Sequence, residues 1–154
     1  MLRSLASNRN LSVFALFVAG LAMAAIVGLV GGNHQAAAAG ECGSSYALNR
    51  TYPISNGTER TGTLELYYSN TTKKNCAINR CSGNCYQALY RSVSIRKSSS
   101  TAWTTDGGLY HTYAGPVYVY APGSCIDAYG GVSFWDGSKY NYDGGRYAYN
   151  IMCG

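Results

Sequence analysis

Apolar and polar residues alternate along much of the chain beyond its N-terminal segment. The pattern is clearest where Leu64, Leu66 and Tyr68 alternate with Glu65 and Tyr67. A period of two places every second side chain on the same face of a β-strand, so that one face can be buried. We find no comparable stretch with the period of a helix, and the pattern therefore predicts a domain built from strands.

Two further segments show the same period. In one, Leu89, Val93 and Ile95 share a face, although Arg91 falls on that face and weakens the pattern. In the other, valines alternate with tyrosines directly after Pro116, and proline is tolerated at the first residue of a strand. Both segments are therefore expected to be strands with one buried face.

Turn sequences that combine glycine with asparagine, aspartate or proline separate these segments. Frequent breaks of this kind are typical of a small antiparallel β-sandwich or barrel. Tyr140–Tyr149 has a Tyr-x-Tyr pair on each side of a glycine pair, so we expect a hairpin with one pair on each arm. The expected turns are Asn56-Gly57, Asp106-Gly107-Gly108, Ala121-Pro122-Gly123, Asp136-Gly137 and Asp143-Gly144-Gly145.

Residues 1–39 differ from the rest because they contain an uncharged apolar run. Arg3 and Arg9 precede this run, which extends from Leu11 to Gly32, and Ala37-Ala38-Ala39 follows as a small-residue cleavage site. This order is typical of a secretory signal peptide, which begins as an apolar helix. About 20 apolar residues can also span a bilayer, so a retained anchor is the alternative. We expect cleavage, because the run is rich in alanine and glycine.

Cleavage would leave residues 40–154 as a single secreted domain without a stable membrane anchor. Its 115 residues carry ten basic and seven acidic side chains, a net charge of +3. A domain of this size buries about two-thirds of the surface that its unfolded chain exposes, which is enough for a hydrophobic core. The basic residues are few and mostly scattered, so we expect no binding to nucleic acid.

All six cysteines lie beyond the expected cleavage site, and an even number in an exported chain predicts three disulfides. The sequence alone does not choose among the possible pairings, but a turn tripeptide can bring Cys81 and Cys85 together. Zinc is disfavoured, because no second close pair of Cys or His completes a four-ligand site. If the remaining cysteines pair in order, the disulfides are Cys42 with Cys76, Cys81 with Cys85, and Cys125 with Cys153.

A set of short motifs runs through nearly the whole of the expected secreted domain. The most specific is Tyr113-Ala-Gly-Pro-Val-Tyr-Val119 with Cys125 six positions further on, and Lys74-Asn-Cys76 supports it. These motifs are similar to those of the spore-associated protein A family. The similarity continues at Gly40-Glu-Cys42-Gly-Ser-Ser-Tyr46, Gly62-Thr63-Leu64, Tyr68, Trp103, Asp106, Cys125-Ile-Asp127 and Cys153-Gly154.

The resemblance implies a small secreted protein found with the spore surface of filamentous bacteria, in a family without established catalytic residues. No active site is therefore carried over, and we expect no cofactor and no metal. The family pattern has cysteines at four of the six positions, which makes Cys81 and Cys85 an addition in this chain and agrees with their pairing. The tyrosine-rich segment 135–149 also departs from the family pattern, so the binding partner of this chain is expected to differ.

The residues offer two routes to hydrolysis, a histidine and a pair of carboxylates, but most of the acidic residues are expected to be structural. Histidine is the commonest general base, and only His111 remains after cleavage, where it could pair with Asp106 or Asp127 to activate Ser124 or Ser133. None of the serines lies in a Gly-x-Ser-x-Gly elbow. We favour a half-exposed structural histidine, and we expect that Asp127 holds a loop in place.

All 15 tyrosines lie beyond residue 39. Tyrosine joins an apolar ring to a hydroxyl group, which suits both sheet packing and binding surfaces, and we assign most of these residues to packing. Tyr140, Tyr142, Tyr147 and Tyr149 are the exception, because their alternation gathers them on one face near Trp135. An exposed aromatic face can stack on sugar rings or adhere to a polymer.

These observations favour a secreted structural or adhesive protein without catalytic activity, located outside the cell or on the spore surface. Its expected partners are components of the spore or cell envelope, a glycan among them. One alternative is a binding or inhibitory protein that inserts the loop between Cys81 and Cys85 into an extracellular enzyme. The other is a small hydrolase built on His111 and Asp127.

Overall fold

A computed structural model describes residues 40–154 with a few gaps. The expected signal peptide, residues 1–39, lies outside the described residues. In the part that is described, no helix is long and apolar enough to cross a membrane. The gaps are Thr58, Asn84, Tyr86, Gln87 and Asp136, and the side chains of Trp135, Tyr140 and Asp143 are also not described.

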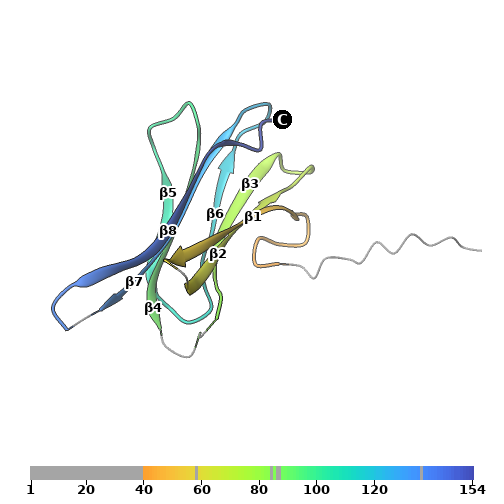
Figure 1. Ribbon diagram of the computed structural model, residues 1–154. Helices are drawn as coiled ribbons and strands as arrows, with labels where there is room; N and C mark the ends of the chain where they lie inside the picture. The colour runs from red at the N-terminus through yellow and green to blue at the C-terminus, as the bar shows by residue number, and fades with distance from the viewer. Residues whose placement is uncertain (1–39, 58, 84, 86–87, 136) are drawn as a thin grey trace, which may run out of the picture. The chain divides into compact units, whose positions relative to one another are not determined.

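The described chain is all-β, as the alternating pattern predicted. Its strands form two antiparallel sheets of four strands, with the orders β1-β2-β3-β6 and β5-β4-β7-β8 (Figure 1). The strands are β1 (Ala47–Asn56), β2 (Glu59–Tyr68), β3 (Lys74–Cys81), β4 (Leu89–Lys97), β5 (Thr104–Tyr110), β6 (Tyr113–Tyr120), β7 (Ile126–Trp135) and β8 (Tyr140–Ile151).

The hydrophobic core lies between the two sheets. Leu64 and Leu66 of β2 are fully buried against Val93 and Ile95 of β4 and their neighbours. Each such side chain contributes about 1.5–3 kcal/mol to the free energy of unfolding when it is fully buried. Arg91 also points inward and is 1% exposed, and its guanidinium donates a hydrogen bond to the carbonyl oxygen of Thr61 at 3.0 Å. The polar exception in the β4 pattern is therefore a buried residue.

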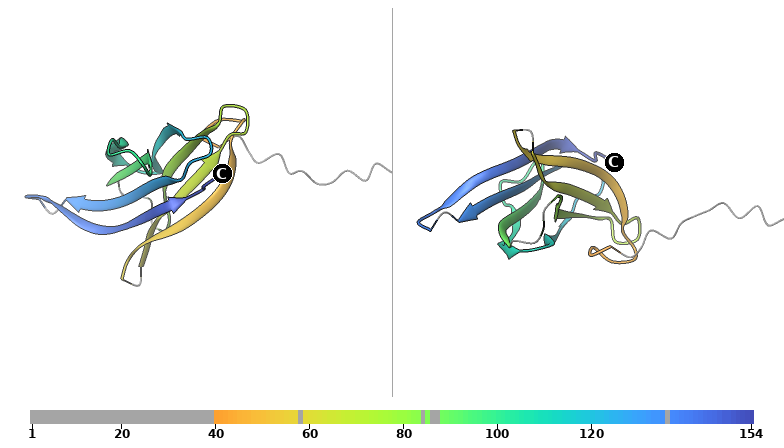
Figure 2. Two further views of the ribbon diagram at one scale, coloured as in Figure 1. Left: turned by 90° about the horizontal axis from the view of Figure 1, so that it is seen from above. Right: turned by 60° about the horizontal axis from the view of Figure 1, so that its bottom comes forward.

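The edges of the two sheets approach each other on both sides, with β5 next to β6 and β1 next to β8. On the first side, the carboxylate of Asp106 in β5 accepts hydrogen bonds from the hydroxyl of Tyr110 at 3.0 Å and from the backbone N–H of Gly115 in β6 at 2.7 Å. Figure 2 shows that the far ends of β7 and β8 extend beyond the neighbouring strands.

The expected hairpin within Tyr140–Tyr149 is wrong, because these residues lie in one continuous strand, β8. The hairpin instead joins β7 to β8. Val132 of β7 pairs with Gly144, whereas the next residue, Ser133, pairs with Tyr142. One extra residue, Asp143, therefore lies in β8 as a β-bulge, and the Asp-Gly-Gly sequence marks this bulge and not a turn.

The expected turn at Asp106-Gly107-Gly108 is also wrong, since these residues lie within β5. A Cβ atom on Gly107 would lie 3.0 Å from the hydroxyl of Tyr90 and 3.3 Å from the Cβ of Ser92. Glycine is therefore needed at position 107 because side chains of β4 approach the backbone closely, and not because the chain turns here.

Pro116 is the fourth residue of β6 and not the first, so the predicted start of this strand is wrong. The register between β3 and β6 shifts between Ala77 and Asn79, which leaves Gly115 and Pro116 in a bulge. The peptide bond between these two residues is cis. An edge strand tolerates proline at a bulge, because the missing N–H removes no hydrogen bond from the sheet.

The other expected turns fall between strands wherever they are described. Asn56-Gly57 ends β1, and Ala121-Pro122-Gly123 joins β6 to β7. Of the pair Asp136-Gly137, the aspartate lies outside the described residues. Gly57, Gly123 and Gly137 all have positive φ, between 58° and 96°, a conformation that glycine adopts without steric cost.

Candidate functional site

A row of polar and aromatic side chains crosses the outward face of the β5-β4-β7-β8 sheet. Thr105 pairs with Ser94, Ser94 pairs with Tyr129, and Tyr129 pairs with Tyr147. Residues that are directly opposite in neighbouring strands project from the same face of a sheet. The row therefore places hydroxyl groups on β5 and β4 beside aromatic rings on β7 and β8.

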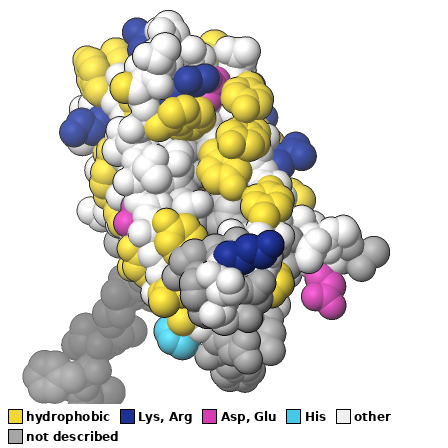
Figure 3. Space-filling model, turned by 90° about the vertical axis from the view of Figure 1, so that its left-hand side faces the viewer, with side chains coloured by type: hydrophobic (Ala, Val, Ile, Leu, Met, Phe, Trp, Pro, Cys, Tyr) yellow, Lys and Arg dark blue, Asp and Glu magenta, His cyan; other side chains and the backbone are white. Residues whose placement is uncertain are grey.

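Four tyrosines form the aromatic part of this surface, and we call them the tyrosine face: Tyr129, Tyr142, Tyr147 and Tyr149. The rings of Tyr129 and Tyr147 have centroids 4.3 Å apart, and those of Tyr147 and Tyr149 are parallel with centroids 5.5 Å apart. Tyr142, Tyr147 and Tyr149 are 65%, 53% and 54% exposed. Figure 3 shows hydrophobic side chains gathered in a patch beside basic ones on the side where β5 and β8 lie.

Two glycines explain why the rings lie along the sheet instead of standing away from it. Gly131 of β7 pairs with Gly145 of β8, next to the row of Tyr129 and Tyr147. A Cβ atom at Gly131 would collide with the side chain of Tyr129, and one at Gly145 would collide with that of Tyr142. Glycine thus leaves the space that the two tyrosine side chains occupy.

A shallow hollow of about 300 Å³ lies beside these rings, lined by Ser94, Trp103, Thr105, Tyr129 and Tyr147. The hydroxyl groups of Ser94 and Thr105 hydrogen-bond to each other at 2.9 Å. The hollow therefore combines aromatic walls with hydroxyl groups, which suits a ligand with apolar faces and polar edges.

Arg96 adds a positive charge next to this hollow. Its guanidinium carbon lies 4.4 Å from the centre of the Trp103 ring, and its side chain forms an ion pair with Asp127 at 2.9 Å. Stacking and ion pairing together fix both side chains. The tryptophan is therefore held in place before any ligand arrives.

Tyr129 is the most perturbed tyrosine of this surface. Burial, followed by the charges of Tyr142 and Tyr147 and a hydrogen bond with Tyr142, raises the pKa of Tyr129 to about 12. Tyr129→Phe is expected to remove a late ionisation near pH 12 from a spectrophotometric tyrosine titration. In the wild type, this shift makes the protein less stable as the pH rises from about 10 towards 12, because the unfolded chain loses the proton first. An ionisation of Tyr129 near pH 10 would contradict this assignment.

The sequence identified part of this surface. Tyr142, Tyr147 and Tyr149 lie together on the outward face, whereas the side chains of Trp135 and Tyr140 lie outside the described residues. Sequence reasoning missed Tyr129 and Trp103. The available signal for Tyr129 was its alternation with the buried residues of β7, which places it on the outward face.

The structure contains three disulfides, and they join the cysteines that the spacing suggested. The disulfides are Cys42–Cys76, Cys81–Cys85 and Cys125–Cys153, and the Cα atoms of these pairs lie 6.2, 6.0 and 4.0 Å apart, respectively.

In the described part of the chain, no cluster of three or more His, Cys, Asp and Glu residues could hold a metal ion.

Most of the residues considered for hydrolysis either are exposed or have hydrogen-bond partners within the fold. His111 is exposed in the turn between β5 and β6. The carboxylate of Asp106 bonds to Tyr110 and Gly115, as described above. Asp127 is 3% exposed and binds Arg96, Ser98 and the backbone of Asn150. Ser124 donates to a nearby carbonyl oxygen. The loop considered for enzyme inhibition contains Asn84, which lies outside the described residues.

Comparison with known proteins gives one relative. The chain is 40% identical over 96 residues to spore-associated protein A of Streptomyces coelicolor, and the aligned region covers 60% of this chain and 56% of that protein. The chain thus spans a little over half the length of this relative. No protein-family model matches the chain, and no solved structure matches it. The resemblance to the spore-associated protein A family that the sequence motifs indicated is confirmed by this similarity.

Proposed function

We propose that this protein is secreted and attaches to a polysaccharide of the spore or cell surface through its tyrosine face, without catalysing a reaction. The observation that carries the proposal is the set of three exposed tyrosine rings on one face of β8, in which the ring of Tyr147 stacks on that of Tyr149 and packs against Tyr129. Similarity to a protein named for its association with spores supports the proposed location.

The chemistry of the face favours a glycan. Sugar rings have apolar faces that stack on aromatic rings and hydroxyl groups at their edges that form hydrogen bonds. The hollow offers aromatic side chains for stacking, and the hydroxyl groups of Ser94 and Thr105 lie on its wall. A row of rings along one strand suits a repeating polymer, since successive sugar units can contact successive rings.

A structural role for the acidic residues supports the absence of catalysis in this proposal. Asp106 joins two sheet edges, and Asp127 joins β7 to Arg96 and to the backbone near the end of β8. Each carboxylate therefore already has partners within the fold. Unchanged activity after His111→Ala, if any hydrolytic activity is found, would dismiss the alternative built on that histidine.

The Tyr142→Ala, Tyr147→Ala double variant is expected to bind insoluble spore or cell-wall polymer about 30-fold more weakly than the wild type. The reason is the loss of two stacking contacts of about 1 kcal/mol each. Sedimentation with purified wall polymer, followed by measurement of the unbound protein, gives the affinity. Tyr120→Ala is the matched control, because Tyr120 is 61% exposed but lies on β6 of the other sheet.

Equal sedimentation of the wild type and the double variant would contradict the proposal. Thermal or denaturant unfolding of the same variant tests the competing role in packing. Exposed rings are expected to change the free energy of unfolding by less than about 1 kcal/mol, whereas a loss of about 3 kcal/mol or more would identify them as packing residues.

A further inference from the structure

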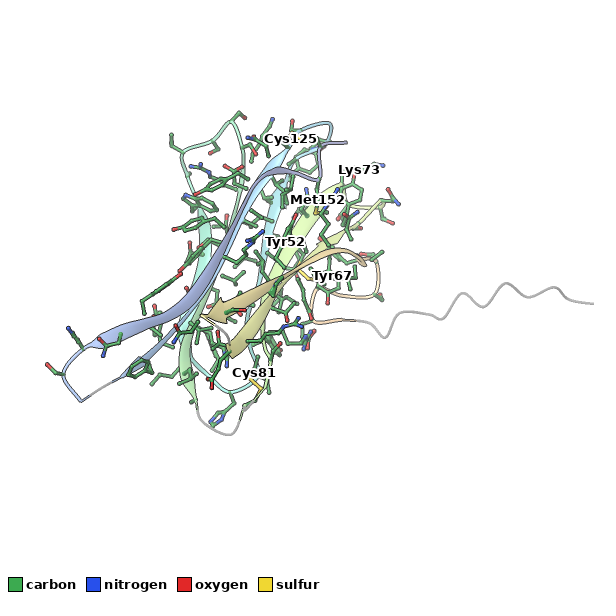
Figure 4. All side chains as sticks on the ribbon, viewed as in Figure 1. Tyr52, Tyr67, Lys73, Cys81, Cys125 and Met152 are labelled. Carbon is green, nitrogen blue, oxygen red and sulfur yellow. A yellow bond between two sulfur atoms is a disulfide. The ribbon has the colours of Figure 1, made fainter. Side chains whose placement is uncertain are left out.

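A cleft of about 760 Å³ opens at the end of the sandwich where β8 ends, on a different part of the domain from the tyrosine face. Its walls come from the start of β1, the β2–β3 connection and the segment that follows β8. In Figure 4 this end carries the labels Met152, Lys73 and Cys125. Its lining includes Asn49, Arg50, Tyr68, Asn75, Asn150 and Met152.

Asn75 is the unusual residue of this cleft. It is 1% exposed, and its Oδ1 has no hydrogen-bond partner. A buried amide oxygen without a hydrogen-bond partner is unfavourable, so such an atom in a folded protein requires an explanation. Because Asn75 pairs with Tyr68 across β3 and β2, the amide and the tyrosine ring lie side by side in the cleft.

The wall opposite Asn75 has an unusual backbone conformation. Asn150 and Met152 have φ values of 50° and 52°, in the left-handed region that residues other than glycine rarely adopt. The Cys125–Cys153 disulfide and the hydrogen bond from the N–H of Asn150 to Asp127 hold this segment in place. The cleft is therefore built and braced before a ligand binds, which reduces the entropy lost on binding.

We propose that this cleft binds a short neutral oligosaccharide. Amide groups both donate and accept hydrogen bonds, as sugar hydroxyl groups do, and four of the lining residues are asparagines: Asn49, Asn70, Asn75 and Asn150. Tyr68 supplies a ring for stacking. Arg50 is the only charged side chain among the described lining residues, and no carboxylate side chain lines the cleft. The volume is within the range of ligand-binding pockets.

No residue of the tyrosine face lines this cleft. Soluble probes test the cleft apart from the insoluble wall polymer. Cellotriose, maltotriose and N-acetylchitotriose are each titrated into the ¹⁵N-labelled protein and followed by NMR. At least one trisaccharide is expected to bind with a dissociation constant of about 1 mM or tighter, and to shift the side-chain amide signals of Asn75 and Asn150. Asn75→Ala and Arg50→Ala are each expected to weaken this binding about tenfold or more.

Leu109→Ala is the matched control and is expected to bind the trisaccharide as the wild type does, because Leu109 is exposed on β5 and lines neither the cleft nor the hollow beside the tyrosine face. The Tyr142→Ala, Tyr147→Ala variant tests whether the sugar binds to the tyrosine face instead. Arg50 is exposed, so the Arg50→Ala variant gives a result even if Asn75→Ala does not fold. The proposal is overturned if none of the three probes binds at about 10 mM, or if Arg50→Ala leaves the binding unchanged. Loss of binding in the tyrosine variant alone would overturn it too, and would assign the sugar to the tyrosine face.

Discussion

Removal of the Cys42–Cys76 disulfide by Cys42→Ala, Cys76→Ala is expected to lower the free energy of unfolding by about 4 kcal/mol. The bond joins residues 34 positions apart, and closing a loop of that length restricts the unfolded chain strongly. Cys81 and Cys85 are only 4 positions apart, so the loss of their bond is expected to cost about 2 kcal/mol. Denaturant unfolding of both double variants measures the difference.

The Cys42→Ala, Cys76→Ala variant is still expected to fold, because the segment around Cys42 has a second attachment. The guanidinium of Arg80 donates hydrogen bonds to the two carboxylate oxygens of Glu41 at 2.9 and 2.6 Å, and it also binds Glu65. The bond to Arg80 holds the pKa of Glu41 below its ordinary value. Cys125→Ala, Cys153→Ala, which opens a loop of similar length, is the control. Equal losses of unfolding free energy on removal of the Cys81–Cys85 and Cys42–Cys76 disulfides would contradict the prediction.

Local pattern was sufficient to predict the strands whose inner faces are buried. The alternation in β2 and β4 corresponds to the observed inward faces, and it placed even Arg91 correctly. It failed at the Asp-Gly-Gly sequences, because glycine occurs both in turns and where another part of the chain approaches closely. At Gly144 a Cβ atom would lie 2.7 Å from the carbonyl oxygen of Ser55, in β1. The sequence around Gly144 contains no sign of that distant contact.

The candidate site was predictable to the extent that it lies on one strand. Tyr147 and Tyr149 are two residues apart in β8, so alternation alone places them on one face. Tyr129 and Trp103 join them only because β7 and β4 lie between β5 and β8 in the sheet, and the order of strands cannot be obtained from local periodicity. The same holds for the cleft, which depends on Asn75 meeting the chain that follows β8.

Asp127→Ala is expected to lower the free energy of unfolding by about 3 kcal/mol at neutral pH, because it breaks a largely buried ion pair. The carboxylate of Asp127 accepts hydrogen bonds from Arg96 at 3.0 Å, from the Ser98 hydroxyl at 2.6 Å and from the N–H of Asn150 at 3.0 Å. The variant would leave all three donors unpaired. Because the Arg96 side chain is 23% exposed, water can solvate it in part. The expected loss of unfolding free energy therefore lies at the lower end of the roughly 3–5 kcal/mol that breaking a buried ion pair costs. Chemical denaturation at pH 7 measures it.

Asp127→Asn separates the charge from the shape of the side chain. Burial would raise the pKa of Asp127, but the bonds from Asn150, Ser98 and Arg96 together hold it below the ordinary value. The folded protein therefore loses its charge at this position at a lower pH than the unfolded chain does. The stabilisation is complete well above pH 4, about the pKa of the unfolded chain, and is lost as the pH falls through the lower folded value. The difference in the free energy of unfolding between the wild type and Asp127→Asn should accordingly narrow from pH 7 to about pH 2, because a protonated aspartic acid resembles asparagine. A difference that stays constant over this range would mean that the charge of Asp127 contributes nothing to stability.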